Sequence, residues 1–176
     1  DYYIFCPKSD YDSLILRLVF RREIWSMDHE VALQLSAFNK LYKELDELYH
    51  DFAKHCGISD CAFWILYSVQ ESVEPYTQKD LSEIWSFSRQ TVNSALKNLE
   101  ADDYIELVPL PGNRKNKEIV LTQKGKNYAE EHVMPLMEAE QNAFGKLTDE
   151  ERSEFLRLTR KHISLLRTET NAILES

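Results

Sequence analysis

The chain has 176 residues, of which 43% are hydrophobic and 29% are charged, and its formal net charge is −9. This length and composition are those of a soluble globular protein with one domain, or with one small domain and an interaction element. The acidic balance argues against non-specific binding of nucleic acid, and no apolar run approaches the roughly 20 residues of a membrane span.

The character of the chain changes at Met27. Residues 1–26 form a leader that we interpret as an upstream extension or a cloning remnant. From Met27 to about residue 56, apolar residues recur along what we predict to be one long helix, with Gly57 as its stop.

Two helices are predicted after Gly57. Ser59 is the expected N-cap of a largely buried helix that ends before Pro75. Thr77, with Asp80 three residues later, forms a variant of the capping box and opens a second, short helix.

The helix predicted after Ser88 has two contrasting faces. Its apolar stripe, at the spacing of an amphipathic helix, consists of Val92, Ala95, Leu96 and Leu99. Its other face carries Arg89, Gln90, Thr91, Asn93, Ser94, Lys97 and Asn98. A merely solvated face would favour Glu and Lys, because Ser, Thr and Asn are mediocre helix formers. With the short turn at Ser86-Phe87, this helix and the preceding one form a helix-turn-helix.

A change to alternating periodicity after Leu99 predicts a β-hairpin. A second run from Glu118 to Leu121 matches the first, and Pro111-Gly112-Asn113 supplies the turn. The expected tip, Asn113 to Lys117, contains three basic residues and no acidic one. Residues 78–126 hold eight basic and seven acidic residues, so the acidity of the chain lies elsewhere.

Two long helices complete the predicted fold. The first follows Thr122 and should be kinked by Pro135 before it ends at Gly145. The second opens with a full capping box, Thr148 and Glu151.

A helix-turn-helix followed by a basic hairpin is the order of a winged helix. A helix fits the major groove, and a hairpin tip can reach a minor groove or phosphates. The alternative is a polar surface helix in an all-α domain, and the basic hairpin in the right order argues against it. The candidate DNA-binding residues are Thr77, Gln78, Ser88, Arg89, Gln90, Thr91, Asn93, Ser94, Lys97, Arg114, Lys115, Asn116 and Lys117.

The sequence resembles the MarR-type winged-helix transcription regulators over about residues 27–174. The resemblance rests on "TQKDLSEIWSFSRQTVNSALKNLEADDYIE", on a hairpin, on "IVLTQKGKNYAEE" and on a helical tail opened by "LTDEE". It implies a mainly α fold with a β-hairpin wing, divided into an N-terminal dimerisation helix (27–56), a winged lobe (57–122) and C-terminal dimerisation helices (123–176). It also implies a homodimer on a pseudo-palindromic operator in double-stranded DNA, and repression relieved by a small-molecule effector or by oxidation. Three cysteines without framework spacing suit free thiols, so we expect a cytoplasmic protein.

Two positions depart from the family pattern. Asn113 and Lys115 stand where the family wing usually has Asp and Arg, so a wing-stabilising ion pair is not expected. Asp102-Asp103 replaces the Gly commonly found after the recognition helix, and Asp tolerates the left-handed conformation that such a turn needs.

Cysteines and aromatic residues are the candidates for a sensing role. Packing is favoured over redox sensing for Cys56 and Cys61, because one follows a helix and the other lies in an apolar run. Zinc sensing is an alternative, because His55-Cys56 with Asp60-Cys61, or Glu131-His132, offer residue types that bind zinc. Their spacing matches no strong zinc signature, so scattered surface histidines are favoured. The residues that we expect to border an effector pocket are Phe63, Trp64, Tyr67 and Tyr76.

No enzymatic chemistry is predicted. The sequence contains no discernible nucleophile–base pair, glycine-rich phosphate loop or paired-carboxylate site, and we expect no cofactor and no metal. A second non-enzymatic alternative is a winged helix that binds protein within a larger assembly.

Overall fold

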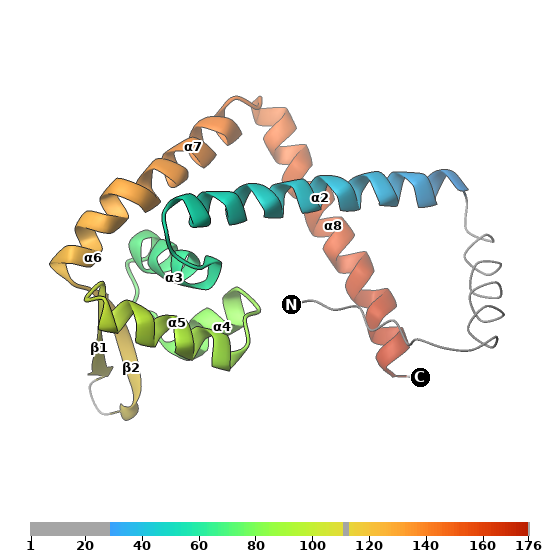
Figure 1. The fold of residues 1–176 in the computed structure, drawn as a ribbon. Helices are drawn as coiled ribbons and strands as arrows, with labels where there is room; N and C mark the ends of the chain where they lie inside the picture. The colour runs from blue at the N-terminus through green and yellow to red at the C-terminus, as the bar shows by residue number, and fades with distance from the viewer. Residues whose placement is uncertain (1–28, 111–112, 176) are drawn as a thin grey trace, which may run out of the picture. The chain divides into compact units, whose positions relative to one another are not determined.

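The computed structural model describes residues 29–110 and 113–175, so the predicted leader lies outside the described residues. The chain divides into two compact units, one that ends at His55 and one that begins at Cys56. Helix α2 (His29–His55) is the described element of the first unit, and every other described element belongs to the second. Figure 1 shows them in chain order.

Three helices of the second unit begin at the predicted caps. Helix α3 (Asp60–Glu71) has Ser59 as its N-cap, and α5 (Arg89–Ala101) has Ser88. Helix α4 (Gln78–Ile84) opens with both hydrogen bonds of the box between Thr77 and Asp80. These bonds satisfy backbone N–H groups that the first helical turn leaves without partners, so local sequence decides where the helices start.

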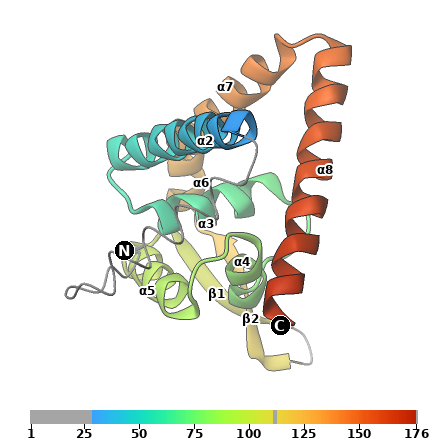
Figure 2. The same ribbon diagram turned by 90° about the vertical axis from the view of Figure 1, so that its right-hand side faces the viewer.

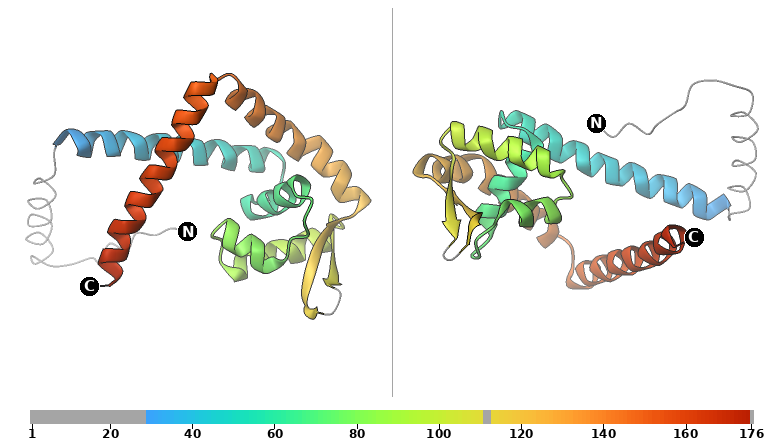
Figure 3. Two further views of the ribbon diagram at one scale, coloured as in Figure 1. Left: turned by 180° about the vertical axis from the view of Figure 1, so that it is seen from behind. Right: turned by 90° about the horizontal axis from the view of Figure 1, so that it is seen from below.

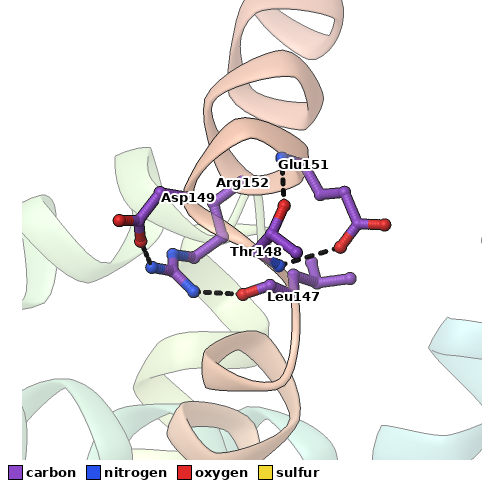
Figure 4. Close-up of polar contacts among 5 residues, drawn as sticks. All are labelled: Leu147, Thr148, Asp149, Glu151 and Arg152. Carbon is purple, nitrogen blue, oxygen red and sulfur yellow. Dashed lines mark hydrogen bonds and ion pairs between the residues drawn. The ribbon is translucent and has the colours of Figure 1, made fainter.

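The last helix, α8 (Asp149–Leu174), begins with the full capping box between Thr148 and Glu151. Figure 4 shows that Arg152 closes the same turn, since its guanidinium donates to the Leu147 carbonyl and the Asp149 carboxylate. The prediction of this boundary is confirmed.

The core lies where α3, α4 and α5 meet the hairpin and the helix that follows it (Figure 2). The apolar stripe predicted on α5 is buried, since Val92 is 0% exposed and Leu96 is 2% exposed. Helix α3 contributes Phe63, Ile65 and Leu66, each at most 1% exposed. At roughly 1.5–3 kcal/mol for each fully buried large apolar side chain, this cluster is the main source of stability for the lobe.

The hairpin is longer than predicted. Strand β1 (Ile105–Leu110) pairs antiparallel with β2 (Asn113–Leu121), from Ile105 opposite Leu121 to Pro109 opposite Lys117. The prediction that Asn113 to Lys117 form the tip is therefore wrong: these residues belong to β2. Asn113 pairs with Leu110 and Lys117 pairs with Pro109, and the register shifts between these two pairs, so β2 has an irregularity at residues 114–116.

The helix after the hairpin changes its hydrogen-bonding pattern ahead of Pro135. It consists of α6 (Gln123–Tyr128), a π-helical segment η1 (Ala129–Val133) and α7 (Met134–Gly145). Pro135 lies in the first turn of α7, where its missing N–H is tolerated. The irregularity predicted at Pro135 is thus found in the five residues of η1 before α7, as a change from α-helical to π-helical hydrogen bonding.

The junction between α5, β1 and α6 explains the spacing of Thr122 and Gly125 in the segment "IVLTQKGKNYAEE". Asp103 adopts φ +60°, the left-handed conformation expected from the replacement of Gly. Thr122 Oγ1 donates to the Asp103 carbonyl at 2.6 Å, and the Thr122 N–H donates to the Tyr104 carbonyl at 3.1 Å. A Cβ on Gly125 would lie 1.9 Å from the Tyr104 carbonyl oxygen, so glycine is required for this close approach.

The long helices bury little. Helix α8 has no buried residue, and α2 has only Ala53. Among the described residues, no helix is both long enough and apolar enough to cross a membrane.

Candidate nucleic-acid interface

The polar face of α5 is open to solvent along the whole helix. Its candidate residues Arg89, Gln90, Thr91, Asn93, Ser94 and Lys97 are all exposed, as is the N-cap Ser88. The buried stripe on the other side holds the helix against the core, so these side chains point away from the lobe. No acidic residue lies in the first turn of α5.

Three of the predicted contact residues also hold the helix ends. Thr77 Oγ1 and the Thr77 N–H both donate to Asp80 Oδ2, at 2.7 and 2.8 Å. Ser88 Oγ accepts from the Thr91 N–H at 3.0 Å and lies 2.8 Å from Thr91 Oγ1. These hydroxyls therefore set the starts of α4 and α5, whatever else they contact.

A concave surface of about 520 Å³ lies between α4, α5 and the hairpin. Figure 3 shows how the ribbons of these elements lie in the lobe. The lining residues of the concave surface are Thr77, Gln78, Lys79, Arg89, Asn93, Leu96, Leu107 and Lys117. Five of these are predicted DNA-binding residues, which the fold brings together from three elements separated in sequence. The lining contains three basic side chains and no acidic one, so it attracts a polyanion.

Sequence reasoning missed Lys79, which lines this surface beside Gln78. It forms an exposed ion pair with Glu83, with Nζ 3.6 Å from Oε1. In the sequence, Lys79 and Glu83 have the spacing of an ordinary stabilising i,i+4 pair on a helix. This spacing gave no reason to place Lys79 at the concave surface. Gln78 Nε2 donates to the Arg89 carbonyl at 3.4 Å and so links the starts of α4 and α5.

The predicted wing residues differ in what the structure describes. Lys117 is exposed and lines the concave surface. Arg114, Lys115 and Asn116 lie in β2, and their side chains are outside the described part of the structure.

The four aromatic residues predicted to border an effector pocket lie in different places. Phe63 is buried in the core at 1% exposure. Trp64 and Tyr67 are half-buried and contact Trp85, with a Trp64–Trp85 ring separation of 4.2 Å. Tyr76 lines a separate cavity of about 370 Å³ between the end of α3, the following loop, β2 and α6. The fold thus separates Tyr76 from the other three.

The cysteines in the described residues are not activated thiols. Burial, with a smaller contribution from the Asp60 carboxylate, raises the pKa of Cys61 to about 11. Burial also raises the pKa of Cys56. Both shifts disfavour the thiolate, the form that reacts with peroxides. Across 29–110 and 113–175, no group of three or more His, Cys, Asp and Glu residues is arranged to hold a metal ion.

Comparisons with known proteins agree with this geometry. Residues 57–115 match the sequence model of the MarR family. No curated protein matches the chain in sequence.

Several solved structures share the fold. The MarR family regulator NMB1585 from Neisseria meningitidis is 23% identical, with a TM-score of 0.66 over 81% of this chain and 97% of that one. Sco3205 from Streptomyces coelicolor, a MarR family transcriptional regulator solved in complex with DNA, is 16% identical, with a TM-score of 0.65 over 78% and 88%. MarR from Staphylococcus aureus, in complex with salicylate and kanamycin, is 17% identical, with a TM-score of 0.61 over 80% and 95%.

The sequence match spans the helix-turn-helix and the first half of the hairpin, the segment that forms most of the concave surface. The structural matches cover about four fifths of the chain. The winged lobe is thus similar in sequence to the MarR family, and the chain has the winged helix-turn-helix fold of these solved structures.

Proposed function

We propose that this protein is a sequence-specific DNA-binding regulator of transcription. The observation that carries the proposal is the concave surface that joins α4, α5 and the hairpin, with Lys79, Arg89 and Lys117 on it and no carboxylate. A chain with a net charge of −9 must concentrate positive charge locally to approach DNA, and this surface does so. The DNA complex of Sco3205, which has the same fold, supports the same use here.

The helix and the hairpin have different tasks in this proposal. The exposed amides of Gln90 and Asn93, in the first turns of α5, suit the donor and acceptor pattern of base edges in the major groove. Lys117 presents a point charge on a strand, which suits a phosphate and carries no sequence information. Arg114 and Lys115 are assigned to the flanking backbone, with Arg114 as the candidate for a minor groove.

The test is selection of duplexes from a random pool, followed by binding measurements on the selected duplex and on a random one. Gln90→Ala or Asn93→Ala should cost roughly 1–3 kcal/mol on the selected duplex and much less on the random one. Lys117→Ala should weaken both duplexes equally and reduce the salt slope by about one unit for each phosphate that is no longer neutralised.

Gln141→Ala, an exposed amide on α7, is the matched control and should change neither binding constant. If no sequence were selected from the pool, the regulator proposal would be wrong, and a protein-binding winged helix would be favoured instead.

We also propose that the protein acts as a homodimer through α2 and α8. On α8, large apolar residues lie in the open: Phe155 is 56% exposed, Leu158 49%, Leu166 53% and Ile173 72%. These four residues share one face of the helix at its period of 3.6. A second copy of this chain is the partner that covers such a face with a symmetric interface, and two lobes then match a pseudo-palindromic operator.

Repression in the cytoplasm, relieved by a small-molecule effector, completes the proposal. The proposal of an effector is supported by the S. aureus protein, which has the same fold and whose structure contains salicylate and kanamycin. Transcription from the selected operator should rise when the gene for this protein is deleted. An effector should release the purified protein from the same duplex, and a fall in transcription on deletion would identify an activator instead.

A further inference from the structure

Trp85 occupies the turn that joins the two helices of the helix-turn-helix. It is the C-cap residue of α4, and Ser86 beside it has φ +55°, in the left-handed region that L residues seldom adopt. Ser82 Oγ donates to the Phe87 carbonyl at 2.9 Å and spans the same turn. A turn in an unfavourable conformation persists only when its surroundings hold it, and its shape sets the direction in which α5 leaves.

The surroundings that hold Trp85 come from α3. Its Nε1–H donates to Ser68 Oγ at 2.7 Å, and the same hydroxyl donates to the Trp64 carbonyl at 2.8 Å. Ser68 is 3% exposed, so the hydroxyl that both bonds share belongs to a buried residue. The Trp85 ring also stacks on Trp64, with centroids 4.2 Å apart and planes 26° apart. One hydrogen bond and one stacked ring thus fix both the position and the rotation of the Trp85 side chain.

The same cluster reaches α7. The Tyr67 ring lies edge-on to both tryptophans, at 5.2 Å from Trp64 and 6.4 Å from Trp85. Tyr67 Oη donates to Glu140 Oε2 on α7 at 2.7 Å. In Figure 2, α3 lies between α4 and the continuous α6–η1–α7 helix, so these interactions form one path across the lobe.

We infer that Trp85 is a positioning residue for the DNA-reading helix, and that Tyr67 and Glu140 couple its position to α7. The inference rests on the proposed function. The recognition residues of α5 contact DNA, whereas Trp85 acts through them by fixing the turn from which the helix starts. A shift of α7 moves Glu140, Tyr67 and the stacked tryptophans together, and so changes the angle of α5 in the groove.

The first test compares Kd for the selected duplex with Kd for a random duplex of equal length. Trp85→Phe keeps a ring and removes the N–H, and Ser68→Ala removes its acceptor. Each should reduce the preference for the selected duplex by about 5- to 30-fold, the worth of one or two kcal/mol. Binding to the random duplex should change less than twofold, because the charges are intact. Tyr104→Phe, a half-buried tyrosine outside the cluster, is the control and should leave the preference unchanged.

The second test examines the coupling to α7 with a matched pair. Glu140→Gln retains an acceptor for Tyr67 Oη, and Glu140→Ala does not. Glu140→Ala should reduce the preference, and Glu140→Gln should restore it to within twofold of wild type. The double variant Trp85→Phe/Glu140→Ala should lose less than the product of the two single losses, because both act through one path. Independent losses would overturn the coupling.

A readout without DNA separates this inference from the proposed function. The stacked tryptophans should give an exciton band in circular dichroism that Trp64→Phe and Trp85→Phe both remove. Glu140→Ala should shift this band, and Glu140→Gln should not. If no duplex is selected but the band responds in this way, the regulator proposal fails and the coupling stands. A band that is insensitive to Glu140 overturns the inference, and so does an equal loss on both duplexes in the first test.

Discussion

The winged lobe buries large apolar side chains, whereas the long helix α8 leaves such side chains exposed. Leu66 and Leu96 in the lobe are at most 2% exposed, whereas Leu158 and Leu166 on α8 are 49% and 53% exposed. Both regions follow amphipathic spacing in the sequence, so periodicity alone does not separate them. The lobe therefore buries its apolar residues within one chain, whereas those of α8 are exposed and, under the dimer proposal, are covered by a second copy.

The largest effect is expected from charge placed on the exposed face of α8. Leu158→Glu combined with Leu166→Glu should weaken self-association at least 100-fold, about 2.7 kcal/mol, because carboxylates would be buried at the proposed interface. Sedimentation across a concentration series measures it. Ser153→Glu with Ser164→Glu places the same charge on the opposite face and should leave the dimer intact. A wild-type protein that is monomeric and folded at micromolar concentration would contradict the dimer.

A truncation in the lobe core sharpens the contrast. Leu66→Ala should lower the free energy of unfolding by roughly 2–5 kcal/mol, since Leu66 is fully buried and its removal leaves a cavity. Leu165→Ala on α8, at 56% exposure, should instead weaken the dimer, so its loss of apparent stability should appear at protein concentrations at which the wild-type protein is dimeric and should vanish on dilution. Urea titrations at two concentrations distinguish the two behaviours, and equal, concentration-independent losses would erase the distinction.

Two glycines provide a smaller, matched comparison. Gly125→Ala should destabilise the protein by about 1–3 kcal/mol, because the new Cβ meets the Tyr104 carbonyl oxygen and the backbone must move. At Gly145, the last residue of α7, an added Cβ would meet no neighbouring side chain or distant backbone within 4 Å. Gly145→Ala should therefore be neutral or stabilising by about 0.5–1 kcal/mol. Thermal unfolding of the pair measures both, and equal losses would show that the close approach at Gly125 is not what requires glycine.

The smallest effect concerns the two described thiols. In a Cys6→Ser background, alkylation at pH 8 should be at least about tenfold slower at Cys61 than at Cys56, because Cys61 is buried and its pKa lies near 11. Folding raises the pKa of Cys61, so the folded state holds this proton more tightly than the unfolded state does. The resulting contribution to stability is fully present below the ordinary pKa of 9.0 and is lost as the pH rises through about 11. Cys61→Ser should remove that alkaline loss.

The redox alternative is tested with the same cysteines. The double variant Cys56→Ser/Cys61→Ser should retain its regulatory response in cells, because neither thiol is activated. A variant that stays folded and bound to DNA but no longer responds would restore redox sensing.

The sequence by itself determined the helix starts and the apolar stripe of α5. Ser59, Ser88, and the pairs Thr77–Asp80 and Thr148–Glu151 act within one turn of the chain, so local chemistry decides them. The left-handed turn at Asp103 was predictable for the same reason. The family resemblance followed from such local patterns in their order, and residues 57–115 carry it.

Only the tertiary structure decided what depends on residues far apart in the chain. Pairing of Asn113 with Leu110 and of Lys117 with Pro109 places the basic segment in a strand. The Tyr104 carbonyl, twenty-one residues before Gly125, makes that glycine necessary. Lys79 lines the basic concave surface because α4, α5 and β2 converge there. Tyr76 lines a different cavity from the one expected, beside β2 and α6. The stack of Trp64 on Trp85 joins two helices whose separate periodicities contain no sign of it. Such interactions arise from packing between elements, which spacing along one element does not encode.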